Sequence, residues 1–122
     1  MPLQNRESFT RSNLFGGKGK VEIWNLLGNL GAPPFRAVLW CELEAGGSVG
    51  LHRQQHDPEI IICISGTGEA VAANQQHPLE PGKMVYLPHG AALSLRNSSS
   101  EENLQYLIIK AKSPKPIQPK TT

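Results

Sequence analysis

From residue 21 onward, the sequence is a succession of short β-prone segments separated by turns rich in glycine, proline or asparagine. No segment keeps the 3.6-residue period of an amphipathic helix over ten or more residues. The chain has 12 glycines and 10 prolines among 122 residues, which favours many tight turns over long helices. Roughly eight or nine closely spaced strands predict an all-β sandwich or barrel.

The pattern divides the chain into three parts. Residues 1–20 show no firm periodicity and are expected to form an N-terminal arm or to add an edge strand. Residues 21–112 are expected to form one β-barrel domain, and the Pro- and Lys-rich residues 113–122 a disordered tail. The expected strands cover residues 21–27, 35–45, 48–54, 59–65, 69–73, 83–88, 92–97 and 104–112, with a further short one within 77–82.

Charge and hydropathy argue against several partner classes. A net charge of +2 is too small to indicate nucleic acid binding, and Lys110, Lys112, Lys115 and Lys120 are interpreted as a solvated C-terminal cluster. No apolar run approaches the ~20 residues of a membrane span, and the polar N-terminus lacks a signal-peptide stretch. A cytoplasmic protein is therefore expected, with its two cysteines, Cys41 and Cys63, as buried reduced thiols inside apolar strands.

Two gapped patterns lie between residues 46 and 97. The first consists of Gly46, His52, Gln54, Glu59 and Gly66, and the second of Gly82, Pro88, Gly90, Leu93 and Asn97. Their spacings resemble the two cupin motifs, G-x5-H-x-H-x(3,4)-E-x6-G and G-x5-P-x-G-x2-H-x3-N. The resemblance implies a single-domain cupin, a jelly-roll β-barrel that forms a homodimer.

The residue types depart from the cupin pattern at the positions of the metal ligands. In cupins, three histidines and the glutamate bind one divalent metal, and here only His52 and Glu59 match. Gln54 offers a weak neutral carbonyl oxygen, and Leu93 at the third histidine position offers no ligand. His56 is a candidate fourth ligand, four residues beyond His52. We expect a site of His52, Glu59 and Gln54 that holds a divalent transition metal weakly or not at all.

Strand parity predicts what lines the barrel. If Glu59 points inward, Ile61 and Cys63 do so too, because alternate residues share a face. Leu93, at the position of the lost ligand, makes its own wall of the interior more apolar. The expected small-molecule pocket is lined by His52, Gln54, Glu59, Ile61, Cys63 and Leu93. Without a metal, His52 and Glu59 form either a structural pair or an acid/base couple.

The same parity turns three isoleucines, Ile60, Ile62 and Ile64, to the outside. Such a face is expected to be covered, either by a partner subunit in a homodimer or by the N-terminal arm.

These observations leave three hypotheses for function. The first is a small cupin acting on a small organic or sugar-like molecule, with isomerase-, cyclase- or lyase-type chemistry carried by His52 and Glu59. The second is a non-catalytic binding or sensing cupin that has lost its metal. The third is a protein with a vestigial pocket that acts through subunit contacts. The fold by itself does not choose among them.

Overall fold

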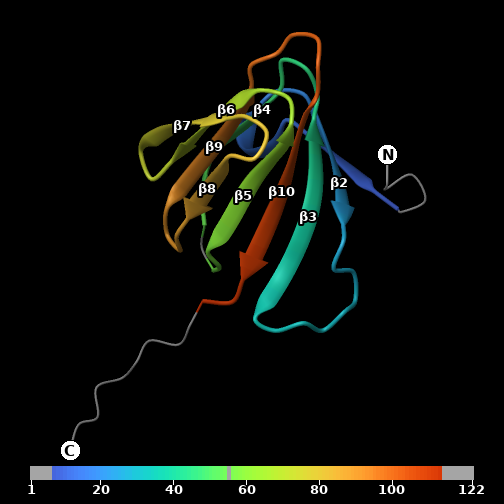
Figure 1. The fold of residues 1–122 in the computed structure, drawn as a ribbon, viewed down its shortest axis with the longest axis vertical. Coiled ribbons are helices and arrows are strands. Elements are labelled where there is room, and N and C mark those ends of the chain that lie inside the picture. Colours follow the sequence, from blue (N-terminus) through green and yellow to red (C-terminus); the bar gives the residue numbers. More distant parts are fainter. Residues whose placement is uncertain (1–6, 55, 114–122) are drawn as a thin grey trace, which may run out of the picture.

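The computed structural model describes residues 7–54 and 56–113 (Figure 1). Within them the chain forms strands and one short 3-10 helix, η1. The elements are β1 (Phe9–Ser12), η1 (Leu14–Gly16), β2 (Lys20–Asn25), β3 (Phe35–Leu43), β4 (Ser48–Arg53), β5 (Glu59–Ser65), β6 (Gly68–Ala72), β7 (Gln75–Leu79), β8 (Met84–Leu87), β9 (Ala92–Asn97) and β10 (Leu104–Ala111). The predicted all-β fold is confirmed.

The strands form two antiparallel sheets. One has the order β1-β2-β3-β10-β5-β8 and the other β4-β9-β6-β7, so that strands distant in sequence lie side by side. Figure 1 looks onto the six-stranded sheet, with β6, β7 and β9 of the other sheet to one side. This arrangement is the jelly-roll barrel that the motif spacing implies. No helix in the described ranges is long and apolar enough to cross a membrane.

Alternation along the strands builds the core between the sheets. In β5, Glu59, Ile61 and Cys63 are buried and the intervening isoleucines are not fully buried, as parity predicts. Opposite them in β10 stand Tyr106 and Ile108, which point to the same side. The fully buried core side chains include Val21, Leu43, Ile61, Cys63, Leu79, Leu87 and Leu104.

One end of the barrel is closed by Asn97 at the end of β9. Its side-chain nitrogen donates to the carbonyls of Leu43 at 3.1 Å, Glu44 at 3.1 Å and Glu102 at 2.8 Å. Its side-chain oxygen accepts from the Ser99 amide at 2.9 Å. One buried amide therefore joins three segments, and such satisfied networks hold loops rigidly.

The described part of the N-terminal arm belongs to the barrel. β1 pairs with β2 as the edge strand, with Phe9 opposite Ile23 and Ser12 opposite Lys20. This is the edge strand that the sequence left open as an alternative. Residues 1–6 of the arm, and residues 114–122 of the predicted tail, lie outside the described residues.

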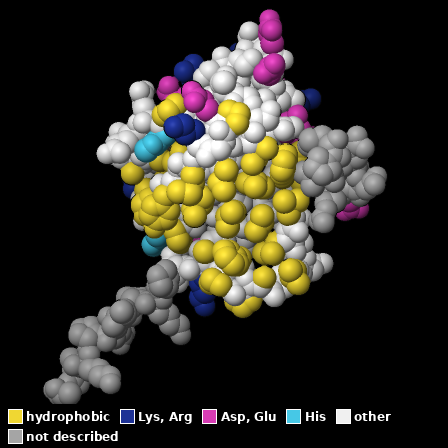
Figure 2. Space-filling view, viewed as in Figure 1, with side chains coloured by type: hydrophobic (Ala, Val, Ile, Leu, Met, Phe, Trp, Pro, Cys, Tyr) yellow, Lys and Arg dark blue, Asp and Glu magenta, His cyan; other side chains and the backbone are white. Residues whose placement is uncertain are grey.

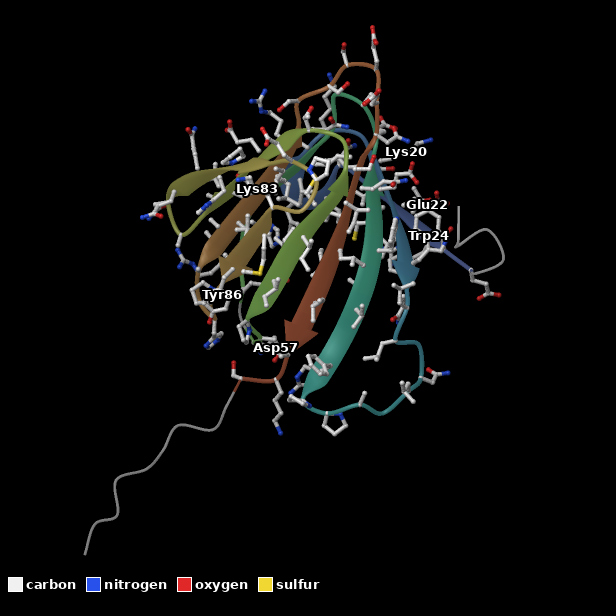
Figure 3. The ribbon with its side chains drawn as sticks, in the orientation of Figure 1. Lys20, Glu22, Trp24, Asp57, Lys83 and Tyr86 are labelled. Atoms are coloured by element: carbon white, nitrogen blue, oxygen red, sulfur yellow. The ribbon has the colours of Figure 1, made fainter. Side chains whose placement is uncertain are left out.

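The outer face of the six-stranded sheet is apolar. Figure 2 shows hydrophobic side chains gathered across it, and Tyr86 on β8 and Trp24 on β2 mark its two sides in Figure 3. Phe35, Met84 and Tyr86 are 49%, 58% and 58% exposed. Around them lie the partly buried side chains of Val38, Trp40, Ile60, Ile62, Leu107 and Ile109. We call this set the outer apolar face.

Candidate functional site

A cavity of about 340 Å³ lies between the sheets, where β4 ends and β5 begins. This is the end of the barrel away from Asn97, because β5 and β9 run from the cavity toward the closed end. The polar side chains that line the cavity include His52 and Gln54 from the end of β4, Glu59 from β5 and Lys110 from β10. Much of the remaining wall is aliphatic, formed by Leu14, Val21, Ile23, Leu39, Val49, Leu93, Leu95 and Ile108.

Glu59 is the most unusual group of the cavity. It is only 2% exposed, and neither carboxylate oxygen has a hydrogen-bond partner among the described residues. Burial raises the pKa of this carboxyl, and the nearby Lys110, Gln54 and His52 lower it by less. Burying a carboxylate without hydrogen bonds that replace its hydration costs free energy. Such a residue is therefore typical of a functional site.

Lys110 stands beside this carboxylate. The register places it directly opposite Glu59 on β5 and Ala37 on β3, so its side chain points into the barrel. Its ammonium nitrogen lies 3.8 Å from a Glu59 oxygen, and the side chain is 34% exposed. The ammonium therefore lies at the opening of the cavity, in contact with both water and the buried carboxylate.

His52 is held in a defined orientation by two contacts. Its Nδ1 lies 2.9 Å from the Gly50 carbonyl, which only accepts, so Nδ1 carries a proton and Nε2 of the neutral ring is an acceptor. The ring stacks on Phe15, with centroids 3.9 Å apart and planes at 12°. The cross-strand neighbour of His52 on β9 is Leu93.

Phe15 reaches His52 because η1 lies directly on β4. A methyl group added at Gly50 would overlap the Phe15 carbonyl, and one at Gly17 would overlap the Ser48 carbonyl. Only glycine allows two backbones to approach so closely. Leu14 and Phe15, which belong to the expected N-terminal arm, consequently line the cavity.

The predicted pocket residues fall into two groups. His52, Gln54, Glu59 and Leu93 line the cavity, whereas Ile61 and Cys63 do not. Both are fully buried, but they lie about 7 and 13 Å further along β5 than Glu59, toward the closed end. Their direct cross-strand neighbours on β10, Ile108 and Tyr106, do line the cavity, so the two side chains are level with the cavity but outside its lining. Parity identified the inward face of β5 but not which part of the interior the cavity occupies.

Their places are taken by residues of the neighbouring strands, Cys41 on β3 and Tyr106 on β10. Burial raises the pKa of the Cys41 thiol to about 12, and burial also raises that of the Tyr106 phenol. Both groups therefore stay protonated and neutral. Cys41 and Cys63 are free buried thiols, as predicted.

Two further residues lie elsewhere than the sequence indicated. His56, the candidate fourth ligand, is exposed and lies outside the cavity lining, and its carbonyl accepts from the Ser113 hydroxyl at 2.9 Å. Lys110 is not part of a solvated cluster but lines the cavity. The alternation of Tyr106, Ile108 and Lys110 on one face of β10 is the signal that could have identified it.

The donor set does not fit a divalent transition metal. No group of three or more His, Cys, Asp or Glu side chains lies within coordinating reach among the described residues. Leu93 is 2% exposed and fills the fourth ligand position with hydrocarbon, directly across from His52. His52, Glu59 and the weak amide Gln54 remain, and an ammonium already stands beside the carboxylate.

Comparisons with known proteins agree with this architecture. The oxalate-binding protein of Thermotoga maritima is 31% identical over 100 residues, which cover 80% of this chain and 81% of that protein. The structure of a predicted oxalate decarboxylase from Thermotoga maritima has a TM-score of 0.82 at 26% identity, covering 89% of this chain and 95% of that one. A putative sugar phosphate isomerase from Acidithiobacillus ferrooxidans has a TM-score of 0.65 at 26% identity, covering 78% and 61%. Residues 39–110 match the cupin domain family, and the chain belongs to this family.

Proposed function

We propose that the cavity binds a small organic molecule whose polar end reaches Glu59 and Lys110 while its carbon framework packs on the aliphatic wall. The observation that carries this proposal is the Glu59 carboxylate, buried at the cavity without a hydrogen-bond partner among the described residues. A ligand would supply the missing partner and offset the cost of burial. The volume of about 340 Å³ is at the lower end of the range for ligand pockets.

The related proteins support a small polar ligand. One is named for binding oxalate, and a structural neighbour is described as a putative sugar phosphate isomerase. Both names denote small anionic molecules, in keeping with the polar groups at the cavity opening. The function proposed here is therefore the binding of a small, polar metabolite-sized compound in the barrel.

A second candidate function is proton transfer on the bound molecule, as in an isomerisation. Burial raises the pKa of Glu59, which makes its carboxyl group the candidate proton donor, while His52, whose Nδ1 is bonded to the Gly50 carbonyl, leaves Nε2 as the candidate acceptor. The two groups come from different sheets and line one cavity. An acid and a base at one ligand are the requirement for general acid–base chemistry. Incorporation of deuterium from D2O into a bound ligand would demonstrate it.

A thermal-shift screen tests the binding function. The panel contains small carboxylic acids, sugar phosphates and neutral sugars, each with chelator present and absent. A compound at 100 times its Kd stabilises the fold by about 2.7 kcal/mol, which raises Tm by roughly 10 °C in a domain of this size.

The matched variants for this screen exploit the alternation of β3. Leu39→Phe fills the cavity and should abolish the shift, whereas Val38→Phe, on the outer face of the same strand, should keep it. A panel in which no compound stabilises the protein would contradict the proposed function. So would an equal shift in both variants.

We also propose that the outer apolar face pairs with the same face of a second copy. Phe35, Met84 and Tyr86 expose about half of their surface there, more than isolated surface residues would explain. Residues 1–6 and 114–122 could otherwise cover it, but their large aliphatic side chains are only Met1, Leu3 and Ile117. A face that is apolar throughout is suited to two-fold, self-complementary pairing.

Light scattering after size exclusion tests this pairing. Met84→Glu, which places a charge on the outer apolar face, should yield monomers. Leu51→Glu is the matched control, because Leu51 is 66% exposed on β4 of the other sheet. A wild-type protein that is monomeric at every concentration would refute the pairing, as would an equal response of both variants.

A further inference from the structure

We propose that Lys110 recognises the ligand and takes the place of the metal ion that the cupin resemblance implies, so that the cavity binds small carboxylates without a metal. This inference rests on the proposed function and names both its ligand class and the residue that selects it. It follows from the position of one ammonium group, from the charges of the cavity and from the wall that faces them.

The position of Lys110 is suited to an incoming anion. Its ammonium lies 3.8 Å from the Glu59 carboxylate, too far for a direct hydrogen bond. Its other cross-strand neighbour is Ala37, whose methyl group is too short to cover it. The three N–H donors are therefore held at the opening of the cavity with room for a ligand oxygen.

The charges of the lining favour an anion. Glu59 contributes one negative charge, and Lys110 and Arg53 contribute one positive charge each. The lining therefore carries a net positive charge. Arg53 is exposed and lies at the rim, where its guanidinium donates to the Gly90 carbonyl at 2.6 Å. Lys110 is thus the cation that reaches the buried carboxylate.

The opposite wall explains why an ammonium suits this cavity better than a metal ion. A divalent ion needs several donors converging on one point, and Leu93 presents carbon at the fourth ligand position. A carboxylate ligand needs only a cation at one end and an apolar or hydrogen-bonding surface at the other. The Gln54 amide and Nε2 of His52 are available for a second polar group of the ligand.

Isothermal titration with glycolate and lactate, whose carboxylate can meet Lys110 while the hydroxyl donates to Glu59, tests the inference, with the protein in EDTA and again with added Mn²⁺. Saturable binding of one carboxylate per chain in EDTA is expected. Lys110→Met should weaken it by about tenfold or more, since a charge-assisted hydrogen bond is lost. The control is Lys112→Met, which removes the same charge two residues away on an exposed side chain and should change Kd by less than about twofold.

Glu59→Gln separates this mechanism from metal binding. If Lys110 recognises the ligand, the carboxylate of the ligand keeps its cation in this variant, and Kd should stay within about threefold of the wild type. If a metal recognises the ligand, the same change removes a metal ligand and should weaken binding. Circular dichroism of each variant establishes that the fold is intact.

The outcomes are distinguishable from those of the proposed function. Carboxylate binding that requires Mn²⁺, or that survives unchanged in Lys110→Met, overturns the inference. Stabilisation by neutral sugars alone also overturns it but leaves the proposed function standing. A panel in which no compound binds overturns both.

Discussion

Replacing Glu59 by glutamine should stabilise the protein at neutral pH. The carboxyl is 2% exposed and has no hydrogen-bond partner among the described residues, and burial raises its pKa from 4.5. Lys110 recovers part of the cost, but it is 3.8 Å away and 34% exposed, so solvent screens the attraction. Glutamine keeps the shape and removes the charge, so the variant should lose the cost of desolvating a carboxylate.

The sign of the pH dependence follows from the raised pKa. The folded protein holds the Glu59 proton more tightly than the unfolded chain does, so this group stabilises the fold at low pH. The stabilisation is fully present below the unfolded pKa of about 4.5 and is lost as pH rises through the higher folded pKa. Between these two values the difference in unfolding free energy between variant and wild type should rise by up to about 1.4 kcal/mol per pH unit.

Urea denaturation between pH 4 and 8 measures this difference, with the fluorescence of the two tryptophans as the signal. Subtracting the unfolding free energy of the wild type from that of the variant at each pH removes the contribution of the other titrating groups. Glu101→Gln, at an exposed loop position, is the control and should give a flat difference. A flat difference for Glu59→Gln as well, or a variant less stable at pH 8 than at pH 4 relative to wild type, would refute the reasoning.

Three further predictions concern the closed end, the η1 contact and the metal position. Asn97→Ala should lower the free energy of unfolding by about 3 kcal/mol, because three carbonyls lose a buried donor; denaturation at pH 7 measures it. Gly50→Ala should displace η1, lowering Tm and removing the ring-current shift of the stacked histidine in NMR spectra; an unchanged shift would contradict the close packing. Gln54→His combined with Leu93→His should retain one Co²⁺ per chain through dialysis, whereas Leu93→His alone should retain less; metal analysis would decide.

The fold could be predicted from sequence because its signals are local. The alternation along each strand and the spacing of the two motifs can be recognised in the sequence without knowledge of tertiary contacts. They placed His52, Gln54 and Glu59 at one cavity, and Leu93 across from them. These positions follow from the pairing register of the strands, which the spacing of the motif residues reflects.

The rest of the site depends on contacts that no single segment contains. Lys110 resembled a tail residue by composition; alternation with Ile108 indicates its inward face, and its pairing with Glu59 places it at the cavity. Phe15 reaches the cavity through the contact of Gly17 and Gly50 with distant backbone. Ile61 lies outside the cavity lining although its cross-strand neighbour Ile108 lines it, because parity does not show which strands the cavity follows. Each error concerns the relation between strands and not the strands themselves.

The alternation of β10 connects two surfaces that would otherwise be independent. Lys110 points into the cavity, while Leu107 and Ile109 of the same strand belong to the outer apolar face. If occupancy of the cavity shifts β10, subunit affinity changes by some factor, and thermodynamic reciprocity requires association to change ligand affinity by the same factor. Ligand titrations at protein concentrations above and below the subunit Kd would reveal this coupling as two different apparent affinities.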